Sequence, residues 1–342
     1  MLRYHAISQV GGVNLPRSTS TEPLLLSVEK IWDSAPHNAF TDLARFRGNF
    51  YCAFRESAAH VRQAGRLRVL RSRDGHTWHP VLLASERGVD LRDPKLSVTA
   101  DGRLMLLAGG TSYRNGQPSG RMPRVFFSVD GESWSKQTRL LAEGDWLWRV
   151  TWHAGRAYGV TYRLASARTW TIHLVSSADG VNYEEMCRLP VRGKPNETTV
   201  RFAADGTMIA LVRRESGDGA GWIGSSRPPY REWSFASTEL RLGGPNFIVA
   251  DDGSMWAATR TIFRVGRGKL AARTVVGPMS LASLRPELEL PSGGDCSYPG
   301  MIIFRGLLWI SYYSSHEGKA SIYIARVRLP FRAPAREHYE AE

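Results

Sequence analysis

Three segments of the chain repeat one pattern, Ser-x-Asp-Gly-x-x-aromatic. They read SRDGHTW at 72–78, SVDGESW at 128–134 and SADGVNY at 177–183. Their starts lie roughly 50 residues apart, which is the spacing of repeated supersecondary units such as the blades of a β-propeller. The repeat therefore constrains the architecture more strongly than any other feature of the sequence.

Each copy of the pattern predicts a tight turn between two strands. Asp-Gly is a strong hairpin signal, because glycine adopts the positive φ that the turn requires. The aspartate side chain accepts hydrogen bonds from backbone amides that follow it, and the aromatic ring packs back over the hairpin. We therefore interpret the three copies as structural turns rather than as an active site.

The remainder of the chain is typical of an all-β protein. Apolar strand-like runs recur from Phe40 onward, and no helical period is sustained. A fourth copy of the pattern at 225–233 keeps the serine and the tryptophan but has lost Asp-Gly. The sequence predicts a six-bladed β-propeller over residues 38–330, an N-terminal extension at 1–37 that packs on it, and a C-terminal tail at 331–342.

The charge balance narrows the class of partner. The chain has 342 residues and a formal net charge of +13, from 45 Lys and Arg against 32 Asp and Glu. The basic residues are scattered, so we expect no nucleic-acid partner. Arginine binds carboxylates in a bidentate manner, which favours a cleft for an acidic ligand. The three cysteines lack disulfide or zinc spacing, and we expect no cofactor and no metal.

The sequence gives no membrane signal. No apolar run approaches the ~20 residues of a membrane-spanning helix, so we expect no membrane partner. The N-terminal residues lack the basic and apolar regions of a signal peptide. We expect a cytoplasmic protein, or a secreted one if a leader had been removed.

Propeller sites lie at one mouth of the central channel, so polar residues that interrupt the inner strands are the candidates. The residues selected on this basis are Asp42, Arg55, Glu56, His60, Arg92, Asp93, Glu197, Arg213, Arg260, Asp295, Tyr298, Tyr312 and His316.

Repeated Asp-Gly boxes on six blades resemble the sialidase (neuraminidase) superfamily. The segment from Asn196 to Arg213 is similar to the sialidase segment that carries an active-site glutamate and, one hairpin later, a substrate-binding arginine. Glu197 and Arg213 fall on those positions. The segment SYPGM, which opens the last blade, resembles the one bearing the tyrosine nucleophile, and Tyr298 falls on it.

Chemistry supports the same trio. A phenol has a pKa near 10 and is a weak nucleophile at neutral pH unless a carboxylate takes its proton. We expect Tyr298 as nucleophile, Glu197 as its base and Arg213 as a clamp for an acidic group.

Two sialidase positions are replaced in this chain. The opening strand of blade one reads Phe40-Thr41-Asp42 where sialidases carry their first clamp arginine. The next loop lacks the aspartate that serves as general acid, and His60 lies approximately there. Asp42, His60 and Asp93 are the alternative proton donors. Substrate-binding roles are expected for Arg55, Arg260, Asp295 and His316.

These features predict a sialidase-like glycoside hydrolase, exo-acting on an acidic or polar sugar of a glycan. Two alternatives remain open at this point. One is a lyase for uronic-acid polysaccharides on the same propeller, with arginine, histidine and tyrosine as its working groups. The other is a glycan-binding propeller without catalysis.

Overall fold

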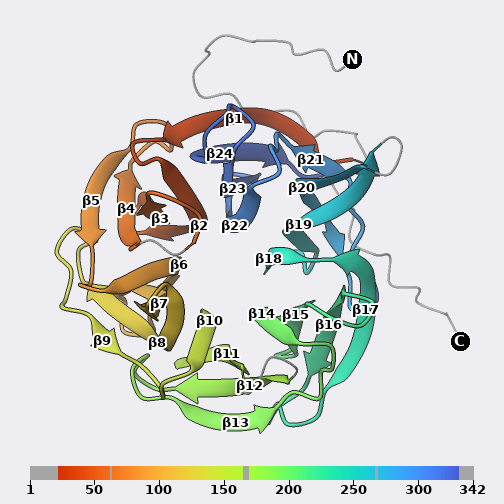
Figure 1. The fold of residues 1–342 in the computed structure, drawn as a ribbon. Helices are drawn as coiled ribbons and strands as arrows, with labels where there is room; N and C mark the ends of the chain where they lie inside the picture. The colour runs from red at the N-terminus through yellow and green to blue at the C-terminus, as the bar shows by residue number, and fades with distance from the viewer. Residues whose placement is uncertain (1–21, 62–63, 165–168, 266–268, 331–342) are drawn as a thin grey trace, which may run out of the picture.

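The computed structural model describes residues 22–61, 64–164, 169–265 and 269–330, and this part of the chain is built from strands. The strands form six four-stranded antiparallel sheets arranged as blades around a central axis (Figure 1). The all-β, six-bladed propeller predicted from the sequence is therefore confirmed. No helix in these ranges is long and apolar enough to cross a membrane.

The first three blades follow one another along the chain, each running from an inner to an outer strand. The first contains β2 (His37–Phe46), β3 (Asn49–Ser57), β4 (Arg66–Ser72) and β5 (His79–Ala84). The second contains β6 (Val89–Val98), β7 (Leu104–Arg114), β8 (Gln117–Ser128) and β9 (Thr138–Arg139). The third contains β10 (Asp145–His153), β11 (Arg156–Leu164), β12 (Trp170–Ser177) and β13 (Glu184–Arg188).

The next two blades repeat this order. The fourth contains β14 (Pro195–Phe202), β15 (Met208–Arg214), β16 (Ala220–Ser226) and β17 (Ser234–Arg241). The fifth contains β18 (Gly243–Val249), β19 (Met255–Val265), β20 (Lys269–Met279) and β21 (Leu288–Leu290).

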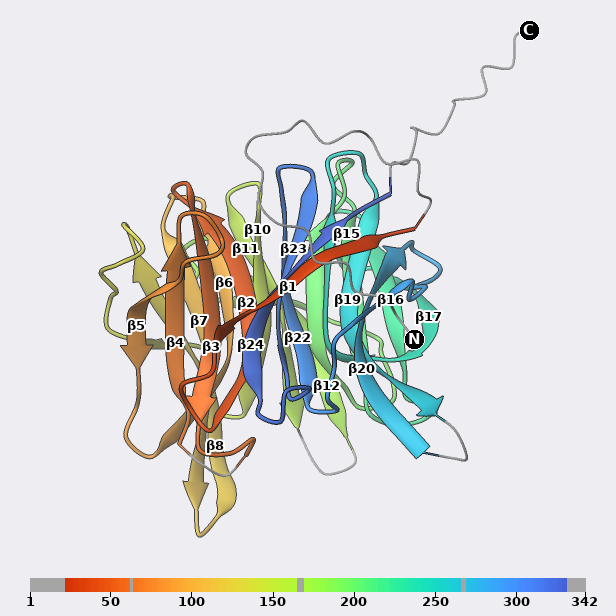
Figure 2. The same cartoon turned by 90° about the horizontal axis from the view of Figure 1, so that it is seen from above.

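The sixth blade joins the two ends of the described chain. It contains β22 (Cys296–Phe304), β23 (Leu307–Ser314) and β24 (Ser321–Arg328), and its outer strand is β1 (Leu24–Trp32). Figure 2 shows β1 crossing beside β24. The predicted boundary at residue 38 is therefore wrong, because residues 24–32 belong to the propeller. Residues 1–21 of the predicted extension and the predicted tail at 331–342 lie outside the described residues.

The Asp-Gly boxes are turns between the third and fourth strands of their blades. In the first box, Ser72 Oγ lies 2.9 Å from the Asp74 carboxylate, which accepts hydrogen bonds from the amides of His76 and Thr77 at 2.8 Å each. These amides hold the pKa of Asp74 well below its usual range. Asp130 and Asp179 accept the equivalent amides. The structural interpretation of the boxes is confirmed.

The hydrophobic core lies between neighbouring blades, where apolar side chains of facing sheets interdigitate. Between the first and second blades, for example, Leu67 and Val69 of β4 and Leu104 and Leu106 of β7 are fully buried in one cluster. The cysteines form no disulfide; Cys52 and Cys296 are buried, as expected for small apolar residues. Burial raises the pKa of the Cys52 thiol, so this cysteine is inert.

Each of the six innermost strands shifts register with its neighbour close to the point where it begins. The shifts lie at Ala39/Asp42, Arg92/Lys95, Leu147/Val150, Pro195/Thr198, Gly243/Asn246 and Ser297/Gly300. A bulge bends the strand and re-aims the side chains that it contains. The six bulges form a ring around one mouth of the channel, and this ring positions the site described below.

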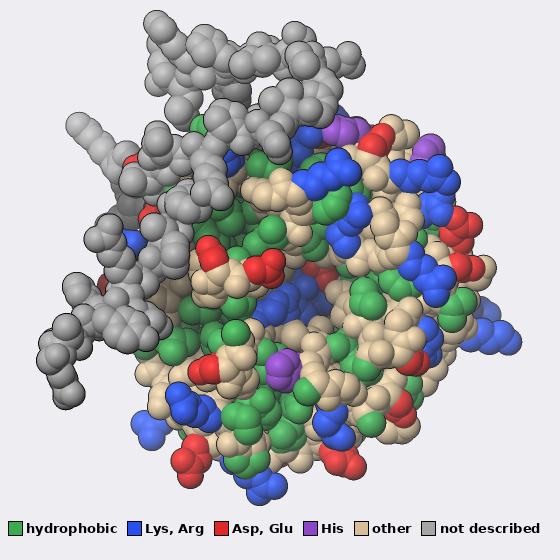
Figure 3. Space-filling view, turned by 180° about the vertical axis from the view of Figure 1, so that it is seen from behind, with side chains coloured by type: hydrophobic (Ala, Val, Ile, Leu, Met, Phe, Trp, Pro, Cys, Tyr) green, Lys and Arg blue, Asp and Glu red, His purple; other side chains and the backbone are tan. Residues whose placement is uncertain are grey.

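Basic side chains are buried at the bulges and farther along the inner strands. Lys95 and Arg149 are almost fully buried, and Arg149 Nη1 lies 2.8 Å from both carboxylate oxygens of Asp42. Burial lowers the pKa of Lys95 to about 8 and that of Arg201 to about 9. The opposite face of the propeller is hollowed at its centre, and Lys and Arg side chains show at the floor of the hollow (Figure 3).

Candidate active site

Tyr298, Glu197 and Arg213 meet at one mouth of the channel. The Tyr298 hydroxyl donates to Glu197 Oε1 at 2.7 Å. Arg213 Nη1 lies 2.6 Å from Glu197 Oε2 and 3.3 Å from the Tyr298 hydroxyl. Glu197 and Tyr298 come from the bulges of the fourth and sixth blades, and Arg213 comes from β15. The structure thus brings together the three residues that the sequence selected.

The electrostatics of this trio favour a protonated Tyr298 beside an ionised Glu197. Burial alone would raise the pKa of Glu197, but the Arg213 guanidinium and the Tyr298 hydroxyl hold it below its usual value. Burial, together with the Glu197 charge, raises the pKa of Tyr298 well above that of a free phenol. In the resting site Tyr298 is therefore protonated, and Glu197 is an ionised acceptor for its proton.

Gly244, in the bulge of the fifth blade, completes the surroundings of Glu197. Its amide donates to Glu197 Oε2 at 2.9 Å. Its φ is +61°, and a Cβ at this position would lie 2.7 Å from the Tyr298 ring. Only glycine combines that backbone conformation with such close approach, so Gly244 makes room for the Tyr298 ring.

A cavity of about 500 Å³ opens over the trio, within the ~300–1,000 Å³ typical of small-ligand sites. Asp93, Glu197 and Tyr298 are in its lining. Burial raises the pKa of Asp93, against the opposing charges of Arg92 and Lys95. Asp93 Oδ1 is buried and has no hydrogen-bond partner within the described residues. A carboxyl group whose pKa is raised in this way is suited to donate a proton.

The cavity walls combine cationic and aromatic side chains. Arg92 lies 3.6 Å from the Asp93 carboxylate, whereas Arg121 forms no ion pair within the described part of the chain. Trp146 and Tyr162 supply aromatic surface beside them. This composition suits a ligand with sugar-like apolar faces and polar or acidic substituents.

Arg260 lies next to the trio rather than in the cavity lining. Its Nη1 is 3.4 Å from the Cys296 carbonyl, and it forms no ion pair in the described ranges. Burial would lower the pKa of Arg260, but its neighbours Tyr313, Tyr298 and Glu197 raise it overall. Arg213, by contrast, is also paired with Glu215 at 2.5 Å. Arg260 is therefore less neutralised than Arg213.

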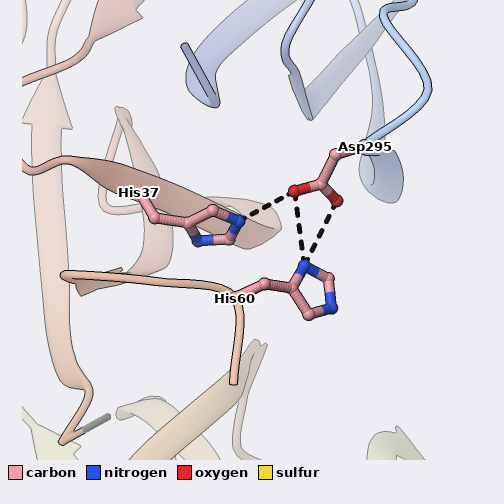
Figure 4. Close-up of side chains that lie close together, drawn as sticks. All are labelled: His37, His60 and Asp295. Carbon is pink, nitrogen blue, oxygen red and sulfur yellow. Dashed lines mark hydrogen bonds and ion pairs between the residues drawn. The ribbon is translucent and has the colours of Figure 1, made fainter. Parts of the chain in front are cut away.

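His60 and Asp295 meet at the rim, together with His37, which the sequence analysis did not select. His37 Nε2 lies 2.9 Å from Asp295 Oδ2, and His60 Nδ1 lies 3.3 Å from the same carboxylate (Figure 4). The Tyr313 hydroxyl donates to Asp295 Oδ1 at 2.9 Å. None of these four residues is in the cavity lining, so the structure groups His60 and Asp295 with each other rather than with the trio.

Three more of the predicted site residues are held by contacts away from the cavity. Arg55 is fully buried and donates to Asp90 at 2.7 Å and to the Ala59 carbonyl, so it positions the loop after β3 and cannot contact a substrate. Asp42 is fully buried, bonded to Arg149 and to the Leu96 amide, which corrects its assignment as a proton donor.

His316 corrects a third assignment. Its Nδ1 lies 2.9 Å from Ser314 Oγ, and its ring packs 4.6 Å from that of Tyr323 on β24. Burial lowers its pKa. The residue follows β23 on the same face as the site, but its contacts are with the sixth blade and it is absent from the cavity lining.

Sequence reasoning missed Lys95, Gly244 and Arg121. Lys95 lies two residues after Asp93, and its Nζ packs 4.4 Å from the Trp148 ring and 5.8 Å from the Tyr298 ring. The run Asp93-Pro-Lys95 near the start of a strand was the sequence signal that could have identified Lys95. Arg121 and Gly244 carry no local signal, because their importance arises from contacts with distant blades.

No protein-family model matches the sequence, and no curated protein matches it. Solved structures do match. A protein of unknown function from Dyadobacter fermentans has a TM-score of 0.77 at 18% identity, over 90% of this chain and 99% of that one. The NanB sialidase from Streptococcus pneumoniae has a TM-score of 0.66 at 14% identity, over 88% and 70%. The α-L-arabinanase from Penicillium chrysogenum has a TM-score of 0.64 at 13% identity, over 88% and 98%.

The fold is that of the sialidase-type propellers. The sequence-based expectation of this fold is confirmed. Two of the three similar structures are glycoside hydrolases by name, and at such low identity the similarity establishes the fold alone. The chemistry of this chain must therefore be argued from its own residues.

Proposed function

We propose that this protein is a glycoside hydrolase that removes a polar or acidic sugar from the end of a glycan with retention of configuration. The observation that carries the proposal is the 2.7 Å hydrogen bond from Tyr298 to Glu197 at the base of a cavity lined by arginines. A cavity at a channel mouth favours a chain end over the interior of a polysaccharide.

The reaction proceeds in two balanced steps. In the first, Tyr298 Oη bonds to the anomeric carbon, its proton passes to Glu197, and the departing glycosidic oxygen takes a proton from Asp93. In the second, water attacks the anomeric carbon and gives a proton to Asp93, the bond from that carbon to Tyr298 Oη breaks, and Glu197 returns its proton to the departing phenolate. The net change is addition of one water across the glycosidic bond.

Arg121 binds the acidic group of the sugar in this proposal. It lines the cavity and forms no ion pair in the described ranges, whereas Arg213 is shared between Glu197 and Glu215. Arg213 therefore holds Glu197 ionised and in position.

A covalent trap tests the nucleophile directly. Fluorinated glycosides with good leaving groups slow the second step and allow the glycosyl-enzyme to accumulate. Across a panel of acidic and neutral sugars, we expect a 1:1 adduct whose peptide map places the sugar on Tyr298. An adduct on another residue contradicts the mechanism. Products of natural glycans that lack the added water and absorb in the near ultraviolet support the lyase alternative instead.

The proposed acid predicts a pH dependence. A general acid works only while protonated, so activity should fall as the pH rises through the raised pKa of Asp93. In Asp93→Asn this alkaline limb should disappear, and turnover of natural glycans should drop about 100- to 10,000-fold. The loss should be much smaller for nitrophenyl glycosides, whose leaving group needs no proton. Profiles of kcat/KM against pH measure both effects.

His60→Ala is the matched control, because His60 is the rival donor predicted from the sequence. We expect His60→Ala to keep the alkaline limb, since His60 is absent from the cavity lining. If His60→Ala loses that limb and Asp93→Asn keeps it, the proton donor is His60.

A further inference from the structure

Two histidines and an aspartate from distant parts of the chain meet at the rim of the propeller. His37 begins β2, His60 lies in the loop after β3, and Asp295 immediately precedes β22 (Figure 4). One nitrogen of each imidazole and one oxygen of the carboxylate all lie within 4.8 Å of one another. We propose that these three side chains bind one divalent transition-metal ion, of which Zn²⁺ is the representative case.

The distances suit a small ion. Zn²⁺ binds histidine nitrogen and carboxylate oxygen at about 2.0–2.2 Å, which places tetrahedral ligand atoms on the order of 3.4 Å apart. His37 Nε2 lies 2.9 Å from Asp295 Oδ2, and His60 Nδ1 lies 3.3 Å from the carboxylate. Because the three ligand atoms already lie within 4.8 Å of one another, modest side-chain movements convert the present hydrogen bonds into metal–ligand bonds.

The donor set selects the class of metal. Two imidazole nitrogens and one carboxylate oxygen suit zinc and neighbouring transition metals, whereas Ca²⁺ and Mg²⁺ prefer sites made wholly of oxygen. Three protein ligands leave a fourth position of a tetrahedral ion for water or another small ligand.

The surroundings hold the ligands in place. The Tyr313 hydroxyl donates to Asp295 Oδ1 at 2.9 Å and leaves Oδ2 for the ion. The His60 ring packs edge-on against Phe40, and the His37 ring packs near both His60 and Tyr313. Such outer contacts orient the ligands of metal sites. The His60 side chain is 44% exposed, so an ion can enter from solvent.

The metal site does not depend on the proposed hydrolase chemistry, because its three residues are absent from the cavity lining. Its test therefore uses binding rather than activity. Tag-free full-length protein, stripped with a chelator, is titrated with ZnCl₂ by calorimetry. We expect one Zn²⁺ per chain and, at saturation, a rise in Tm of about 2–5 °C. Co²⁺ should bind with visible absorption in place of Zn²⁺, and Ca²⁺ should not compete.

The variants locate the site. His60→Ala and Asp295→Asn should each weaken Zn²⁺ binding at least tenfold and abolish the Co²⁺ absorption. His316→Ala is the matched control, since His316 lies on the same face outside the cluster, and it should bind as the unmodified protein does. His60 is half-exposed, so His60→Ala tests the site even if Asp295→Asn folds poorly.

Absence of stoichiometric Zn²⁺ binding overturns the proposal. So does a His60→Ala protein that binds Zn²⁺ with unchanged affinity, because surface pairs such as His76–Glu29 and His173–Glu185 would then account for the binding.

Discussion

Tyr298→Phe should reduce turnover about 1,000-fold or more while leaving the propeller folded. The substitution removes one oxygen atom, which is the atom that bonds to the anomeric carbon in the proposed first step. The ring keeps its packing against Phe40 and Trp148. Glu197 keeps its bonds to Arg213 and to the Gly244 amide, so the stability loss should be only about 1–2 kcal/mol. Steady-state kinetics and chemical denaturation measure the two quantities.

Tyr158→Phe is the matched control for this experiment. Tyr158 is buried in β11 against Phe202 and Tyr230, away from the cavity lining. The same loss of a hydroxyl should there leave kcat/KM within about twofold. Near-full activity in Tyr298→Phe would remove tyrosine from the mechanism and favour a different nucleophile.

Removing β1 should have the largest effect on stability. Deleting residues 1–33 leaves β24 as an unpaired edge and removes seven backbone pairings between β1 and β24. It also removes the Trp32 indole that donates to buried Glu56 at 2.9 Å. At about 0.5–1.5 kcal/mol per net hydrogen bond, the free energy of unfolding should fall by on the order of 5 kcal/mol, with aggregation through the exposed edge.

A peptide in trans separates the effect of β1 from that of the residues before it. A synthetic peptide of residues 22–33, EPLLLSVEKIWD, should raise the Tm of the truncated protein in a concentration-dependent manner. A scrambled peptide should not. If the truncated protein unfolds at the Tm of the full chain, β1 is dispensable and ring closure through the sixth blade contributes little.

The repeated boxes explain why the blades were predictable and the closure was not. The Ser-x-Asp-Gly turn is satisfied within seven residues, by the aspartate and the amides that follow it, so the sequence displays it directly. β1 has no such local mark. Its assignment to the sixth blade depends on pairing with β24, almost 300 residues away, and a predicted extension was the natural but wrong interpretation.

The contacts of the candidate site are likewise partly local and partly long-range in sequence. Glu197 and Arg213 lie on adjacent strands of one blade, so their pairing follows from a single hairpin. Tyr298 joins them across 101 residues, and only the resemblance of its segment to sialidases predicted that contact. Arg55 and Asp42 were also selected because they interrupt inner apolar strands. They do not reach the cavity, because Asp90 and Arg149 hold them inside the fold.

The scaffold could therefore be predicted from local signals, since the box repeat specifies turns and their period. Tertiary structure alone decided which polar residues reach the cavity, because the six bulges re-aim side chains in a way that no local pattern records. It also decided which residues of different blades meet. The boxes specify turns in the first three blades, and the closed ring brings Tyr298 to Glu197 and Asp295 to His37 and His60.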